Sequence, residues 1–322
     1  MRAKGSYCYW SAVNGTYALM MQAVVDSARQ AGVFKDFHIW TDSPISGATC
    51  HPAGQFETRL CLFKLHFLRD QVSRLNYDYF VWLDADNYFV REPPDLLSVM
   101  QGSPVHSSLE SDACLPGNLR EDWYDCTLKD YVTLMRYMGV RSRAIFNVNG
   151  GFWIVHHDVI QRFCELAFEF LEIAARAGFE FPDEPGLAYA TQMLCGNPYL
   201  HTLRQTAQLW ASDWTGWYAG RLPDGNAWDF TDYFTFHRFQ VNPAIVHAMR
   251  SKEALCQRAR LRAADSSSAP PLPGQAAGRR GVAASAGRRS TAAQAKSGNG
   301  EATSRQQAGA AAGARSKAWR TR

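Results

Sequence analysis

Two carboxylates stand at positions i and i+2 directly after an apolar segment, in the sequence Leu83-Asp84-Ala85-Asp86-Asn87. The segment before them, YFVWL at residues 79–83, is typical of a buried strand. We expect Asp84 and Asp86 to converge on one hard cation, because Mg²⁺ and Mn²⁺ take oxygen ligands. Such a cation bridges a diphosphate and neutralises the charge that builds on it as a group leaves. Solvated acids at a strand end are the alternative, and the pair alone does not decide.

The elements that must position this pair alternate between strands and helices. Apolar patterns predict strands at residues 6–13, 37–40 and 79–83, and helices at residues 17–31 and 60–75. The alternation predicts an α/β fold with a single, Rossmann-like, mostly parallel sheet and helices on both faces. Ligands of such sheets bind beyond the carboxyl ends of the strands, which is where Asp84 and Asp86 stand.

The second half of the chain is less regular. Asn147, Asn149, Gly150 and Gly151 precede the apolar letters FWIV, which predicts a turn that leads into a strand. Residues 159–177 have the spacing of an amphipathic helix. Residues 210–236 are crowded with aromatic and turn residues, a composition suited to binding an acceptor substrate.

The basic charge of the chain is confined to its C-terminal segment. Residues 263–322 hold ten Lys and Arg against two acids, a formal charge of +8, whereas the whole chain carries +4. Residues 1–262 therefore carry −4, which disfavours nucleic-acid binding by the folded domain. The Ala-, Gly-, Ser- and Arg-rich segment has one aromatic residue, Trp319, and too little apolar surface for a core. We expect a folded domain at residues 5–258 and a disordered tail at 259–322; RNA or anionic-membrane binding is an alternative role for the tail.

The eight cysteines are dispersed along the chain and form no C-x-x-C pair. This pattern argues against a zinc ribbon and against a small disulfide scaffold. Reduced thiols favour a cytoplasmic location. We also expect neither a signal peptide nor a transmembrane segment, because no run of about 18 apolar residues occurs.

A longer stretch around the carboxylate pair, residues 64–90, resembles the nucleotide-sugar transferases of the GT-A fold, especially glycosyltransferase family 8. That family includes glycogenin and bacterial lipopolysaccharide galactosyltransferases. Its further motifs are matched in order, at motif level, over residues 7 to about 255: the N-A-G turn by Asn149-Gly150-Gly151, the D-Q pair by Asp183-Glu184, and the terminal His by His247 with Lys252 after it. Two departures stand out. The pair is Asp-Glu, and the segment from His247 to Lys252 is one residue shorter than in the family and lacks its Gly.

The resemblance implies a GT-A domain that transfers a hexose from a nucleotide-diphosphate sugar, with UDP favoured. The acceptor would be a hydroxyl of a glycan, a lipid-linked molecule or a protein, and the anomeric configuration would be retained. It further implies a Mn²⁺ (or Mg²⁺) ion held by Asp84, Asp86 and His247. His237 is the rival for the third ligand, and a core or surface role is the alternative for His247.

The resemblance also implies which residues meet the donor, and these are Asn14, Tyr17, Asp42, Lys64, Ala85, Asn149, Gly150, Gly151 and Lys252. For some of them a structural role is an open alternative: core packing for Tyr17, a helix N-cap for Asp42 and an exposed helix surface for Lys64. Asp183 is expected to bind donor hydroxyls. Glu184 is expected to stabilise or attack the anomeric carbon, with an ordinary loop acid as its alternative.

Three other functions share parts of this pattern. A haloacid-dehalogenase-type phosphatase would use Asp84 as its nucleophile, but that class usually has Thr or Val where Tyr88 stands, and its motif follows the first strand. A sugar nucleotidyltransferase needs a Gly-rich, Arg-containing loop after the first strand, and SAVNGTY at residues 11–17 is not one. A non-catalytic binding protein would not need Asp84, Asp86, His247 and Lys252 together. The sequence therefore favours the transferase, with the phosphatase as the alternative.

Overall fold

The computed structural model describes residues 5–57, 59–114, 119, 122–124, 126–195, 208–212, 218–219, 228–231 and 238–248. All of them belong to the first of the two units into which the chain divides, Met1–Ala269. The expected disordered tail at residues 259–322 lies outside the described residues. None of the helices in the described part has the length and apolar character needed to cross a bilayer.

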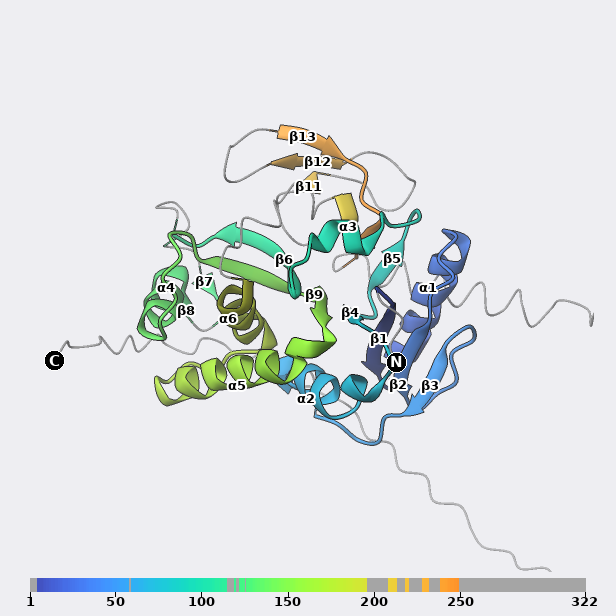
Figure 1. Cartoon of the computed structure of the whole chain (residues 1–322), viewed down its shortest axis with the longest axis horizontal. Coiled ribbons are helices and arrows are strands. Elements are labelled where there is room, and N and C mark those ends of the chain that lie inside the picture. The colour runs from blue at the N-terminus through green and yellow to red at the C-terminus, as the bar shows by residue number, and fades with distance from the viewer. Residues whose placement is uncertain are drawn as a thin grey trace, which may run out of the picture. The chain divides into compact units, whose positions relative to one another are not determined.

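A six-stranded sheet forms the centre of the domain, in the order β3-β2-β1-β4-β9-β6 (Figure 1). The first four strands of this order are mutually parallel, and β9 runs antiparallel to both β4 and β6. The strands are β1 (Tyr7–Val13), β2 (Phe37–Thr41), β3 (Thr49–Pro52), β4 (Tyr79–Leu83), β6 (Val105–Asp112) and β9 (Phe146–His156). A mixed α/β fold with a mostly parallel central sheet is thereby confirmed.

Neighbouring residues along each strand point to opposite faces of this sheet, and each face has its own core. Trp10, Trp82 and Trp153 lie side by side on one face, with Trp82 and Trp153 stacked at a centroid distance of 5.9 Å. Tyr9 and Val81 belong to the core of the other face. The expected helices on both faces are therefore present.

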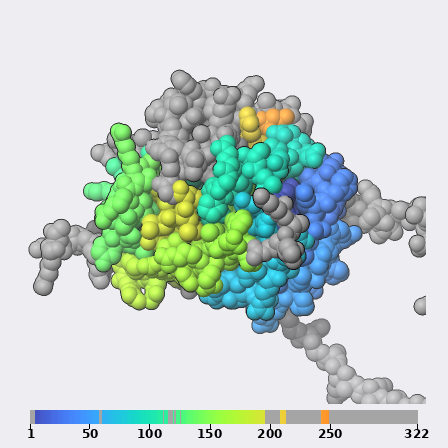
Figure 2. Space-filling view, in the orientation of Figure 1, coloured from blue at the N-terminus to red at the C-terminus, as the bar shows by residue number. Residues whose placement is uncertain are grey.

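The helices divide between the two cores. Helix α1 (Thr16–Gln30) and the short α3 (Leu96–Met100) contribute to the core of Tyr9, whereas the remaining α-helices contribute to the core of the three tryptophans. These are α2 (Phe63–Asp70), α4 (Leu128–Tyr137), α5 (Ile160–Arg176) and α6 (Asp183–Cys195). The surfaces of α2 in light blue and α5 in lime green adjoin in the space-filling view (Figure 2).

Three expectations about these elements need correction. The helix expected at residues 60–75 is divided into the 3₁₀ turn η1 (Arg59–Cys61), α2 and a second 3₁₀ turn, η2 (Val72–Arg74). Positive φ angles at Leu60 and Cys61 separate η1 from α2. The turn expected at residues 147–151 is instead part of the first half of β9, which continues through both glycines. Strand β3 was not expected, so β4 is the fourth strand along the chain and not the third.

Smaller elements complete the described part. Strand β5 (Asn87–Phe89) pairs with β14 (Ile245–His247), and β14 pairs with β10 (Trp210–Ser212). The others are the hairpin β7 (Asp122–Trp123) and β8 (Cys126–Thr127), the 3₁₀ turn η4 (His157–Val159), and a sheet of β11 (Tyr218–Ala219), β12 (Trp228–Thr231) and β13 (Arg238–Val241). The rest of the aromatic region expected to bind an acceptor, within residues 210–236, lies outside the described residues.

Candidate metal centre and its surroundings

Asp84, Asp86 and His247 come together at the end of β4. Each offers one ligand atom, and the three atoms lie within 4.8 Å of one another. The pairing of β14 with β5 brings this about, because its register sets His247 opposite Asn87. The predicted ligand set is therefore gathered in one place, although 161 positions separate His247 from Asp86 in the sequence.

The imidazole of His247 fits a metal-binding role. Its Nδ1 atom lies 3.2 Å from Ser212 Oγ, which suits a ring that donates through Nδ1 and keeps Nε2 for a cation. The Nε2 atom is buried, lies 3.0 Å from Asp86 Oδ1, and has no hydrogen-bond partner among the described residues. A buried polar atom without a hydrogen bond is costly, and a shared cation between Nε2 and the carboxylate would satisfy it.

The carboxylate of Asp84 is fixed from one side. Its Oδ1 atom accepts a hydrogen bond from Trp82 Nε1 at 2.9 Å and lies 3.1 Å from Lys64 Nζ. The turn after it is held by Asn87, whose Nδ2 donates to the carbonyls of Asp84 and Gly151. Oδ1 thus has two protein partners, which orient the carboxylate at the site.

Lys64 is 4% exposed and lies between two acids, so the exposed-surface alternative for it is wrong. Its ammonium is 3.1 Å from Asp84 and 3.2 Å from Asp183, and it also donates to the carbonyl of Gly150. Burial alone lowers the pKa of Lys64, but Asp183 and Asp84 outweigh this and raise that pKa well above its ordinary value. Burial in turn raises the pKa of Asp183 to about 6, against the effect of Lys64.

Glu184 follows Asp183 in the first turn of α6, so neither acid lies in a loop. Its Oε1 atom accepts a hydrogen bond from the backbone N–H of Gly150 at 2.7 Å, and its Oε2 atom accepts one from the hydroxyl of Tyr124. Burial and the nearby carboxylate of Glu110 raise the pKa of Glu184 to about 8. The acid is therefore held in a fixed orientation, and its charge is sensitive to what binds nearby.

Three polar residues of this site were missed by sequence reasoning. Glu110 on β6 accepts hydrogen bonds from the amides of Asn147 and Asn149, two residues apart on the adjacent strand β9. Tyr124, with a φ of 58°, reaches Glu184 from the turn between β7 and β8. Ser212 faces His247. Only Glu110 had a signal in the sequence: Asn147 and Asn149 are two residues apart, and alternate residues of a strand share one face, so both can bind the same partner.

The side chains that surround the two glycines of β9 leave no room for a Cβ atom at either position. A Cβ atom on Gly150 would lie 3.0 Å from Glu184 Cγ, and one on Gly151 would lie 2.8 Å from Cε1 of His247. The two glycines therefore leave room for the side chains of Glu184 and His247. Asn149 accepts a hydrogen bond from the N–H of Gly151 and donates one to Glu110, so its amide is also fixed.

Replacing Gly151 with Ala is expected to weaken Mn²⁺ binding by about 10- to 100-fold, as loss of support around a metal ligand does. The added methyl group would displace the imidazole of His247, because it would lie 2.9 Å from Nε2. Calorimetric titration with Mn²⁺ measures the affinity. Gly150→Ala is the matched control, since its methyl group meets Glu184 and Asp183 instead. Equal affinities of Gly151→Ala and the unmodified protein would contradict the placement of His247.

Replacing Glu184 with Gln is expected to flatten the pH dependence of stability between about pH 6 and 8. A carboxyl group whose pKa is raised on folding keeps its proton longer in the folded state, so stability falls as the pH rises through that interval. With a pKa of about 8, Glu184 produces such a fall, and an amide cannot. Chemical denaturation should give a slope of up to about 1.4 kcal/mol per pH unit that is lost in the variant.

Glu169 on the exposed side of α5 provides the control for this experiment. Glu169→Gln should keep the pH dependence of the unmodified protein. An identical slope in Glu184→Gln and Glu169→Gln would show that Glu184 does not titrate in a buried environment.

Other residues expected to meet a donor stand at the same edge of the sheet. Asn14 follows β1 and Asp42 follows β2, and the parallel register aligns these two strand ends. Asp42 lies on a shallow cavity of about 460 Å³ at the ends of β2 and β3. No helix begins at Asp42 in the described residues, so the N-cap alternative is wrong. Tyr17 is 49% exposed, which excludes the core-packing alternative.

Two expected contributors cannot be placed beside this centre. Lys252, the expected phosphate-binding cation, and His237, the rival metal ligand, both lie outside the described residues. Ala85, between the two acids, is buried.

The seven cysteines of the described part are all free thiols, as expected.

Comparison of this chain with protein-family models and with curated proteins finds no match.

Proposed function

We propose that this chain is a metal-dependent glycosyltransferase that moves a hexose from a nucleotide-diphosphate sugar, with UDP favoured, to a hydroxyl acceptor. The observation that carries the proposal is the convergence of Asp84, Asp86 and His247 beside the buried Lys64. Two carboxylates and an imidazole suit Mn²⁺, with Mg²⁺ as the second choice. Such an ion supplies Lewis-acid neutralisation of the charge that develops on a leaving diphosphate.

Residues around the ion would hold its ligands in position. Asp84 is oriented by Trp82 and Lys64, and His247 is oriented by Ser212, so the ligands are arranged before a donor arrives. Such preorganisation is the main source of electrostatic catalysis. The nucleotide would lie along the strand ends at Asn14 and Asp42, with the exposed ring of Tyr17 available to stack on a base.

The sugar is assigned to the region of α6 and β9. Asp183 would accept hydrogen bonds from donor hydroxyls, and Asn149 would contact the sugar near Gly150 and Gly151. Glu184, held by the N–H of Gly150 and by Tyr124, would stabilise the positive charge that develops on the anomeric carbon. The pKa of Glu184 is about 8, and positive charge on the anomeric carbon would favour its ionised form. That carboxylate beside the anomeric carbon would support transfer with retention of configuration.

The phosphatase alternative is less well supported. It does not need a histidine ligand, whereas here His247 completes a three-ligand set with Asp84 and Asp86.

A thermal-shift comparison tests the proposal. UDP with Mn²⁺ is expected to raise the melting temperature, with a stabilisation of about 2.7 kcal/mol at a concentration 100 times its dissociation constant. UDP without metal and GDP with Mn²⁺ are expected to have much smaller effects. Hydrolysis of p-nitrophenyl phosphate without any release of UDP from UDP-hexoses would favour the phosphatase and contradict the transferase.

A further inference from the structure

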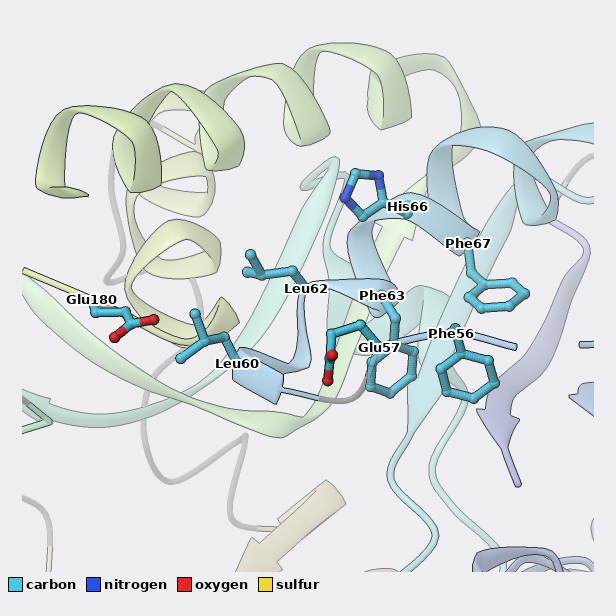
Figure 3. Close-up of a pocket in the computed structure, with 8 residues that line it drawn as sticks. All are labelled: Phe56, Glu57, Leu60, Leu62, Phe63, His66, Phe67 and Glu180. Carbon is cyan, nitrogen blue, oxygen red and sulfur yellow. The ribbon is translucent and has the colours of Figure 1, made fainter. Parts of the chain in front are cut away.

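An apolar pocket of about 370 Å³ opens beside the candidate site, at the start of α2 (Figure 3). Its lining comes mainly from Phe56, Leu60, Leu62, Phe63 and Phe67. This volume lies at the lower end of the range for pockets that enclose small molecules. None of the residues of the candidate metal centre lines it, and it shares no lining residue with the cavity at the ends of β2 and β3.

Aromatic rings form one wall of the pocket. The ring of Phe56 lies 4.7 Å from that of Phe63 and 5.3 Å from that of Phe67, measured between centroids. All three rings are only partly buried and pack against the core of the three tryptophans. They therefore present an apolar surface to whatever enters.

The pocket and the charged site formed by Lys64, Asp84 and Asp183 lie on two sides of one short segment, residues 60–64. Leu60, Leu62 and Phe63 line the pocket, whereas Lys64 faces Asp84 and Asp183. Cys61 also belongs to the charged side: burial raises the pKa of its thiol to about 11, and the charges of Lys64 and Asp183 act on it as well.

The backbone conformation separates these two groups of side chains. Leu60 and Cys61 have φ angles of 59° and 57°, a left-handed conformation that is unfavourable for residues with a Cβ atom. Two such residues in succession persist only where the surroundings hold them, and strained backbone of this kind is concentrated at ligand-binding sites. Glu180 also lines the pocket, and in the sequence it stands three residues before Asp183 of the charged site.

We propose that this pocket binds an apolar group of the acceptor, such as an aryl or alkyl aglycone, while the acceptor hydroxyl points past Cys61 toward the sugar. The assignment of the ligand as an acceptor rests on the proposed transferase function. An apolar group suits the aromatic wall, and the adjacency to Lys64, Asp183 and Glu184 places it within reach of the reacting sugar. The donor is a poor occupant, because its charged diphosphate would meet the phenylalanine rings.

The test compares glycosides that share a sugar and differ in their aglycone. Binding of p-nitrophenyl, octyl and methyl glucosides, and of the same galactosides, is measured by calorimetry and by saturation-transfer NMR, without donor or metal. The p-nitrophenyl and octyl compounds are expected to bind at least about tenfold more tightly than the methyl compounds, because one apolar group leaves water. The ratio between the aryl and alkyl arms identifies which apolar group fits better.

Leu62→Trp, which fills the pocket, is expected to remove this tenfold preference. Leu19→Trp, at an exposed leucine of α1, is the matched control and should keep it. Phe63→Leu provides a second, milder change in case Leu62→Trp does not fold, and it should reduce the preference without abolishing it. A preference that is absent in the unmodified protein, or unchanged in the pocket variants, would overturn the proposal.

The same measurements separate this proposal from the proposed function. In Asp86→Asn the aglycone preference should remain, because the pocket does not depend on the metal. Aglycone binding without Mn²⁺-dependent release of UDP from any UDP-hexose would leave the pocket standing and refute the transferase. A dimer in analytical ultracentrifugation that Leu62→Trp dissociates would assign the pocket to a second copy of the chain and overturn the acceptor assignment.

Discussion

Replacement of Asp86 by Asn is expected to lower metal-dependent sugar transfer by about 10³-fold or more, because the charge that develops on the diphosphate would lose its counter-ion. Asp86 is 4% exposed and faces Nε2 of His247 at 3.0 Å. An amide there keeps the shape of the side chain but removes the negative charge that attracts a cation. The measurement is the rate of UDP release from UDP-hexoses as Mn²⁺ is titrated, together with the Mn²⁺ content of the purified protein.

The control for this variant is Asp158→Asn, an acid at 69% side-chain exposure in η4. It should retain full activity and full Mn²⁺ binding. Circular dichroism should show that Asp86→Asn is folded, since the substitution changes no volume. A folded Asp86→Asn protein with undiminished Mn²⁺-dependent transfer would remove this residue from the site.

Replacement of Lys64 by Met is expected to destabilise the fold by about 3–5 kcal/mol, as removal of one member of a buried ion pair does. The ammonium lies within 3.2 Å of Asp183 and 3.1 Å of Asp84, and also donates to the carbonyl of Gly150. Met fills a similar volume, but it leaves two carboxylates near each other without a counter-charge. Urea denaturation measures the change in the free energy of unfolding.

Two further variants test whether the stability lost in Lys64→Met comes from its buried ion pairs. Lys129→Met, at an exposed position of α4, should change stability by no more than about 0.5 kcal/mol. Adding Asp183→Asn to Lys64→Met should recover part of the loss, because one of the two opposed charges is then gone. A loss below about 1 kcal/mol in Lys64→Met would mean that the ion pairs are solvated, contrary to the described burial.

The carboxylate pair and its strand could be predicted from the sequence because both signals are local. The letters YFVWL at residues 79–83 fix a buried strand, and the acids follow it directly. The parallel arrangement of β1, β2 and β4 follows from the intervening helical segments, and it places Asn14, Asp42 and Asp84 at one edge. The strands that carry these three residues could therefore be predicted from the apolar patterns of the sequence.

The contacts across the site depend on pairings that periodicity does not reveal. His247 meets Asp86 only because β14 pairs with β5, and these strands have three residues each. Glu110 and Tyr124 reach Asn149 and Glu184 from elements that are distant in sequence. A single sequence contains no signal for such registers, so the resemblance alone suggested His247.

Two local expectations failed because tertiary contacts override local preference. Gly150 and Gly151 indicated a turn, yet they lie inside β9, where the side chains of Glu184 and His247 occupy the space of a Cβ atom. The apolar spacing of residues 60–75 indicated one helix, yet the positive φ angles at Leu60 and Cys61 delay its start. In both places the exception lies beside the proposed reaction centre.

Anomalous diffraction at the manganese absorption edge, from crystals soaked with Mn²⁺, tests the central claim most directly. One strong peak is expected about 2.0–2.3 Å from a carboxylate oxygen of Asp84, from one of Asp86 and from Nε2 of His247, as in metal sites of oxygen and nitrogen ligands. A peak bound elsewhere, or no peak at concentrations that support activity, would contradict it.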